Sequence, residues 1–152
     1  MEEKHQEVWL RMYEEQVRHG RHHEALRSQS TNLIIAISAA LLAFLAGTKG
    51  ALDNWYLQMF AGVFVIVINF YGLVMSLKHY ERSRMHVTVA GKYRDVLSQI
   101  SGVVGTNLNS ERGAGKKKHQ NRFSMSKYVR AYLMWSGLHL LLGALGMVIL
   151  LA

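Results

Sequence analysis

The residues best suited to chemistry form a cationic cluster in a segment rich in glycine, asparagine and serine. Residues 105–122 read GTNLNSERGAGKKKHQNR, and the cations of this segment are Arg112, Lys116, Lys117, Lys118 and Arg122. Clustered cations on flexible backbone bind polyanions such as nucleotides, oligonucleotides or lipid head groups. A Walker A phosphate loop is excluded, because Ser110 and Lys117 stand where that motif needs Gly and then Ser or Thr. We therefore predict a motif-free anion site here, with Arg82 and Arg84 as secondary contacts.

The same cations have a simpler interpretation. Lysines and arginines beside a membrane span fix its orientation and touch anionic lipid without any further ligand. For the triplet Lys116–Lys118 taken alone, the sequence favours this topological role.

Histidine is the second group of chemical interest, with eight copies in 152 residues. His19 and His23 stand four apart on a predicted helix, a spacing that could chelate a metal, and His22 lies beside them. No third ligand can be assigned beyond Glu24 or His86, so we predict polar contacts in a helix seam and no metal site. Sensing of pH by these imidazoles stays open.

Catalytic arrangements are absent from the sequence. There is no Cys, no Ser–His–acid pattern, no paired carboxylate and no cofactor fingerprint. We expect a protein that is not an enzyme and that carries no cofactor.

Three stretches without charged residues determine the fold class. They cover 28–48, 54–77 and 131–152, and the last is interrupted only by His139. At about 1.5 Å per residue each helix reaches about 30 Å, the thickness of the hydrocarbon core of a bilayer. The chain also lacks Pro, so nothing breaks a helix from inside. We predict an all-α integral membrane protein with three transmembrane helices.

Orientation follows from the charges between the spans. The segment 78–130 holds 12 Lys and Arg against three acidic residues, a net charge of +9, whereas 49–53 holds one charge of each sign. Because basic loops stay in the cytoplasm, the amino terminus is predicted inside and the carboxyl terminus outside. We expect a multi-pass protein of the bacterial inner membrane, in contact with membrane lipid.

The segments outside the membrane are predicted to be mostly helical. Two series of residues spaced alternately by four and three define seams that would pair as a cytoplasmic helical stalk: His5, Trp9, Met12, Gln16, His19, His23 and Leu26, and His86, Ala90, Tyr93, Leu97, Ile100 and Val104. The predicted segments are an amphipathic helix (1–27), span 1 (28–48), an external hairpin (49–53), span 2 (54–77), a cytoplasmic extension (78–104), a basic loop (105–123) and span 3 with its lead-in (124–152).

Polar and small residues inside the spans suggest assembly. Asn69 and Ser38 are predicted either to line a pore or to hydrogen-bond between helices, because an unpaired amide is costly in lipid. Close packing between copies is assigned to Ala36, Ala40 and Ala43, with Trp9 outside the membrane. Three spans cannot enclose a water path alone, so a pore needs a homo-oligomer, a tetramer or a similar assembly.

The segment EVWLRMYEEQVRHGRHHEALRSQSTNLIIAISAALLAFLAG, Glu7–Gly47, with the hairpin and the second helix to about Ile100, resembles the SLATT-type membrane effectors of bacterial anti-phage defence. The resemblance extends to the channel-forming partner of a nucleotidyltransferase in Hailong-like systems. It implies a pore that is controlled by a nucleotide or oligonucleotide ligand made by that enzyme. The third span, 131–152, departs from the two-span pattern of the family.

The functional expectation is an oligomeric, ligand-gated pore that depolarises the membrane and arrests growth. Three alternatives stay open: a phage-type holin that forms lesions without a ligand, a non-conducting scaffold that anchors a soluble partner, and a metal or pH sensor. A response to nucleotide, conductance in liposomes and bound metal would separate them.

Overall fold

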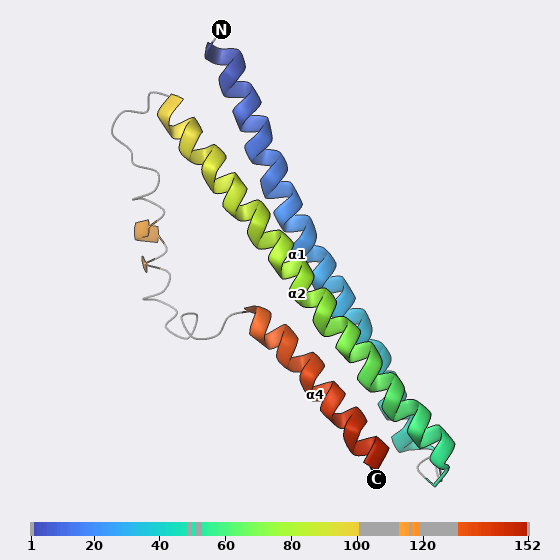
Figure 1. The fold of residues 1–152 in the computed structure, drawn as a ribbon. Coiled ribbons are helices and arrows are strands. Elements are labelled where there is room, and N and C mark those ends of the chain that lie inside the picture. Colours follow the sequence, from blue (N-terminus) through green and yellow to red (C-terminus); the bar gives the residue numbers. More distant parts are fainter. Residues whose placement is uncertain are drawn as a thin grey trace. The chain divides into compact units, whose positions relative to one another are not determined.

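The regular structure of the described residues in this computed structural model is all-α and is dominated by three long helices (Figure 1). They are α1 (Glu2–Gly47), α2 (Trp55–Ile100) and α4 (Ala131–Leu151). Each is long and apolar enough to cross a membrane. The structure describes residues 2–48, 50, 53–100, 113–115, 117–118 and 131–151.

A short turn connects α1 to α2. The last turn of α1 is closed by the Thr48 amide, which donates to the Phe44 carbonyl at 3.1 Å. Gly50 then adopts a φ of +74°, which only glycine takes without strain, and its carbonyl accepts from the Asp53 amide. Asn54 caps α2, since its side-chain oxygen accepts from the Leu57 amide at 3.3 Å. The turn sets the two helices side by side in opposite directions.

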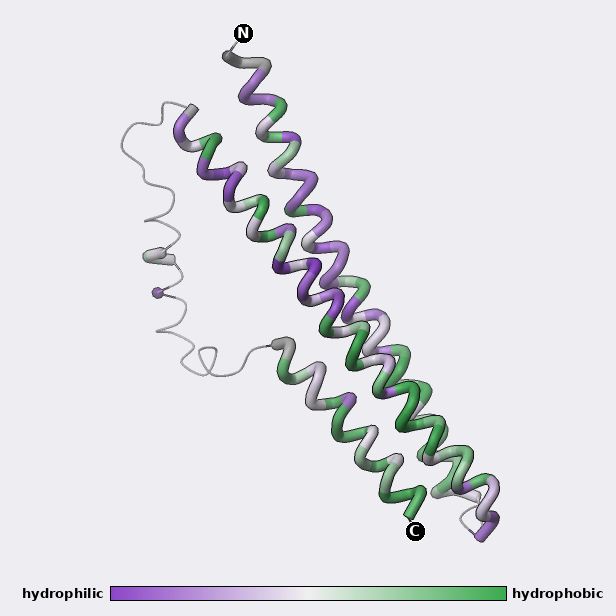
Figure 2. The backbone as a smooth tube through the Cα atoms, viewed as in Figure 1, coloured by the Kyte–Doolittle hydropathy of each residue, from purple (hydrophilic) through white to green (hydrophobic). Residues whose placement is uncertain are grey.

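The described chain packs as two units. One unit, here called the polar pair, joins the beginning of α1 up to Glu24 to the part of α2 from Glu81 onward. The other, called the apolar bundle, joins Ala25–Gly47 of α1, Trp55–Tyr80 of α2 and the whole of α4. Figure 2 shows the difference in composition, with hydrophilic residues frequent in the polar pair and hydrophobic residues dominant in the apolar bundle.

The polar pair is held along the two seams that the sequence predicts. The rings of Trp9 and Tyr93 lie 5.6 Å apart, and Ala90 is buried. Gly20 permits the close approach of α1 and α2, because a Cβ there would lie only 3.5 Å from the Val87 side chain. The predicted pairing of the two seams is confirmed by these contacts.

The apolar bundle has its polar residues inside and its apolar residues outside. Four of the largest fully buried side chains among the described residues are His139, Asn69, Thr31 and Ser38. The outer surface carries large apolar side chains, among them Leu33, Phe70, Leu140, Leu141 and Val148, each at least 61% exposed. A water-soluble protein has the opposite arrangement. Such a surface suits contact with hydrocarbon, as expected for three helices that are long and apolar enough to cross a membrane.

Glycine contacts set the distance between α2 and α4. A Cβ on Gly62 would lie 3.0 Å from the Gly146 carbonyl oxygen, and a Cβ on Gly146 would lie 3.0 Å from the Gly62 carbonyl oxygen. The two backbones therefore touch at a point where no side chain fits. Close backbone contact of this kind is a principal source of helix association in lipid.

Enlarging Gly146 should separate α4 from α2. Gly146→Leu is expected to destabilise the apolar bundle by about 1–3 kcal/mol, the usual cost of overpacking, measured as a lowered thermal midpoint in detergent. Gly137→Leu on the same helix is the matched control, because nothing lies within 4 Å of its Cβ position. Equal midpoints for the two variants would contradict the packing described.

Candidate functional site

A chain of hydrogen bonds crosses the interior of the apolar bundle. It comprises Thr31 and Ser38 of α1, Asn69 of α2 and His139 of α4, here called the polar cluster. The Asn69 amide nitrogen donates to Ser38 Oγ at 2.8 Å and to the Val65 carbonyl at 2.9 Å. His139 Nδ1 lies 3.2 Å from Asn69 Oδ1, and its Nε2 lies 3.4 Å from Thr31 Oγ1. The polar cluster thus links all three helices.

The hydrogen-bond partners identify which groups of the polar cluster are donors and which are acceptors. Because the Asn69 nitrogen already donates twice, its Oδ1 is the acceptor that faces His139. His139 Nδ1 must then carry the proton, and Nε2 accepts from the Thr31 hydroxyl. Every group finds a partner with an uncharged imidazole. A buried network of this kind is stable when all its members are satisfied.

The polar cluster determines how α4 packs against α1 and α2. A Cβ on Gly72 would overlap the His139 imidazole and would lie 2.9 Å from the Ile34 side chain. Glycine at this position therefore leaves the space that the imidazole fills. α4 contains no Asp, Glu, Lys or Arg and a single histidine, His139, whose side chain is fully buried against α1 and α2.

The structure describes the residues to which the sequence assigns roles inside the spans. Ser38 and Asn69 bond each other between α1 and α2, which is the interhelix role of the two that the sequence allows. Ala36, Ala40 and Ala43 are all exposed on α1. Trp9 contacts Tyr93 within the chain, and its role between copies stays a prediction. Sequence reasoning did not find Thr31 and His139 as partners, although a lone histidine in a span without charged residues was a usable signal.

The histidines of the polar pair form a stack. His86 of α2 lies against both His19 and His23 of α1, with ring centroids 5.3 Å and 5.4 Å apart and interplanar angles of 26° and 12°. His86 Nδ1 also lies 2.7 Å from Gln16 Oε1, and His19 Nε2 lies 3.5 Å from a Glu15 carboxylate oxygen. Among the described residues no group of three or more His, Cys, Asp or Glu side chains has a metal-binding arrangement. Stacking and hydrogen bonding explain this cluster.

The predicted anion-binding residues are only partly described. Arg82 and Arg84 are exposed on α2, and Lys117 and Lys118 are exposed as well. Arg112, Lys116 and Arg122 lie outside the described residues. The anion site as a whole therefore stays a prediction.

No family model matches the chain, and neither a curated protein nor a solved structure matches it. The argument for function consequently rests on the residues and their geometry.

Asn69 and His139 should be energetically coupled. Removing either side chain leaves the other without its partner inside an apolar bundle, and hydrogen bonds between membrane helices contribute about 0.6–1.7 kcal/mol. A double-mutant cycle of Asn69→Leu and His139→Leu, measured by unfolding in detergent, is expected to give a coupling energy in this range. Strictly additive effects would refute the direct bond.

Proposed function

We propose that this protein is the pore-forming effector of a bacterial anti-phage defence system. In this proposal several copies assemble in the inner membrane, with the polar pair in the cytoplasm, and a nucleotide or oligonucleotide made by a partner nucleotidyltransferase controls the pore. Opening depolarises the membrane and arrests growth. The proposal joins the resemblance to SLATT-type effectors with three physical features of the chain.

The first feature is the incomplete burial of the spans. Only 22%, 33% and 11% of the most apolar windows of α1, α2 and α4 are buried within the chain. Within the described residues of one copy, Ser38, Asn69 and His139 bond to one another, and three helices are too few to enclose a water path. A pore formed by this protein must therefore lie between copies.

The second feature, the one on which the proposal chiefly rests, is the outer face of α1. Asn32, Ala36, Ala39 and Ala43 are spaced by four, three and four, so they share one face of the helix, and all four are exposed. A neighbouring outer face of α1 instead carries bulky Leu33 and Phe44, 61% and 55% exposed. An amide is costly against lipid, and small side chains admit close helices. The face that carries Asn32 therefore suits contact with other copies and with water.

The third feature is the charge outside the spans. The segment from Lys78 to Arg130 carries a net charge of +9, and Arg82, Arg84, Lys117 and Lys118 are exposed. Such a surface attracts polyanions. A polyanion can shift a gate only by binding one state more tightly than the other, so the ligand must contact groups whose spacing differs between the open and closed assemblies.

Two other functions account for part of these features. A holin would use the outer face of α1 but would have no use for the paired helices of the polar pair. A scaffold would use the polar pair but would have no use for an exposed amide and a row of alanines on a span. The pore uses both.

Ion flux into liposomes tests the proposal. The purified full chain should dissipate a potassium gradient, and Asn32→Leu with Ala39→Leu should reduce the rate at least about tenfold, because two leucines fill and dry the proposed lining. Val148→Leu, at an outer position of α4 that is 62% exposed, is the matched control and should leave the rate unchanged. A wild type without flux under any nucleotide condition would exclude a pore and favour the scaffold.

A further inference from the structure

A cavity of about 370 Å³ opens between α1 and α2 within the polar pair. Tyr13, Gly20 and Arg21 line it from α1, and Ser83, Gly91 and Arg94 line it from α2. Ligand pockets occupy about 300–1,000 Å³, so this cavity has room for one small organic molecule and not for a long polymer. None of its lining residues belongs to the basic segment in which the sequence predicts the anion site.

Two arginines give the cavity its chemistry. Arg21 and Arg94 come from different helices, and Glu24 also lines the cavity, which leaves a net charge of +1 from two guanidinium groups and one carboxylate. Arginine pairs with phosphate through two parallel hydrogen bonds more effectively than any other side chain. The cavity therefore combines a phosphate-binding group on each wall with one acceptor.

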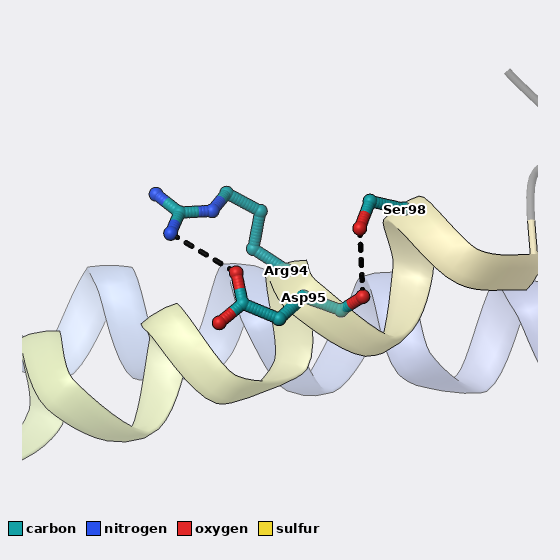
Figure 3. Close-up of polar contacts among 3 residues, drawn as sticks. All are labelled: Arg94, Asp95 and Ser98. Atoms are coloured by element: carbon teal, nitrogen blue, oxygen red, sulfur yellow. Dashed lines mark hydrogen bonds and ion pairs between the residues drawn. The ribbon is translucent and has the colours of Figure 1, made fainter. Parts of the chain in front are cut away.

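The neighbouring Asp95 carboxylate holds the Arg94 side chain in place. Its Nη2 donates to Asp95 Oδ1 at 3.2 Å, and its side chain is only 24% exposed. The Asp95 carbonyl accepts from Ser98 Oγ at 2.7 Å (Figure 3). A guanidinium has five N–H donors, and the contact with Asp95 uses one of them. This contact orients the group at the wall of the cavity and reduces the entropy lost on binding.

Packing alone does not explain Gly91. A glycine inside a helix costs about 0.5–1 kcal/mol relative to alanine, and nothing lies within 4 Å of the Cβ position of Gly91. The space in front of Gly91 is empty and belongs to the cavity. A side chain at this position would occupy the volume that a ligand needs.

We propose that this cavity binds a nucleoside monophosphate or a single nucleotide unit of an oligonucleotide. The phosphate lies between Arg21 and Arg94, and the base lies in the space left by Gly91, against the ring of Tyr13. Glu24 accepts a hydrogen bond from a sugar hydroxyl or from an exocyclic amine of the base. This inference builds on the proposed function and moves the regulatory site from the basic segment to the helix pair.

A ligand in this cavity would join α1 to α2. Each arginine belongs to a different helix, so the phosphate holds the two helices at one spacing. Gating follows if the open and closed assemblies differ in that spacing, because the ligand then favours one of them.

The test uses the full chain in detergent and AMP as the probe, with binding measured by calorimetry. AMP is expected to bind at least about tenfold more tightly than adenosine or inorganic phosphate, since only AMP uses both parts of the cavity. Glycerol 3-phosphate, which has the chemistry of a lipid head group, should bind as weakly as phosphate. Equal affinity for AMP and glycerol 3-phosphate would overturn the nucleotide assignment.

Charge variants locate the site. Arg21→Gln and Arg94→Gln should each weaken AMP binding about tenfold or more, the usual contribution of a charge-assisted hydrogen bond. Lys92→Gln is the matched control, because it removes a positive charge from an exposed position of α2 that does not line the cavity. An equal loss in Lys92→Gln would show diffuse attraction to the basic surface and would overturn the proposal.

Gly91 variants test the volume of the cavity. Gly91→Leu should abolish AMP binding while helix content is retained, and Gly91→Ala should raise the thermal midpoint and weaken binding only slightly. Thr88→Leu, which adds the same side chain to an exposed position of α2, should bind AMP normally. Normal binding in Gly91→Leu would overturn the proposal.

The pore proposal fails or holds independently of these results. Ion flux by the wild type, measured with and without nucleotide, tests the pore, and calorimetry tests the cavity. Flux without AMP binding would support the pore and contradict the nucleotide site. AMP binding without flux would support the nucleotide site and contradict the pore.

Discussion

The buried hydrogen bonds between Asn69, His139, Ser38 and Thr31 are the interaction on which the apolar bundle depends. With a neutral imidazole each of these four buried side chains has at least one hydrogen-bond partner among the others. In hydrocarbon an unpaired polar group costs several kcal/mol. Association of α4 with α1 and α2 is thus specified by His139 and permitted by Gly62, Gly72 and Gly146, where larger residues would not fit.

The interior of the bundle also constrains function. In the proposed pore, permeation would require a polar surface other than the polar cluster, whose members bond to one another within one copy. The outer face of α1, with Asn32 and its alanines, is the candidate, because contact with lipid alone does not account for an exposed amide. In the proposed regulation, the ligand would bind to the polar pair, in which Arg21 and Arg94 line the same cavity from two helices. The two units would then have separate tasks, both of which involve α1.

Much of the fold could be predicted from the sequence, because it follows from local patterns. Charge-free stretches predict the three helices of membrane-spanning length, and the spacing of Trp9, His19, Tyr93 and His86 predicts which faces meet. The positions of the Asn69 amide and of the small residues of α1 could also be predicted from the sequence. Each of these signals lies within one helix.

What the sequence did not predict depends on register between helices. The partners of Asn69 are 31 and 70 residues away, and a shift of one helical turn would have changed them. Arg21 and Arg94 share a cavity for the same reason, whereas the basic cluster around Lys117 drew attention because its residues are adjacent in sequence. The role proposed for Gly91 depends on the empty space at its Cβ position, which the structure shows and the sequence does not.

Labelling of single cysteines in membranes tests the central claim most directly, and the chain has no native cysteine to interfere. Cysteine is introduced in turn at Asn32, Ala39, Leu33 and Val148, and each protein is exposed to a charged, membrane-impermeant thiol reagent. The account predicts reaction at positions 32 and 39, which face water between copies, and protection at positions 33 and 148, which face lipid. Protection at all four positions, or reaction at position 148 as fast as at position 39, would contradict it.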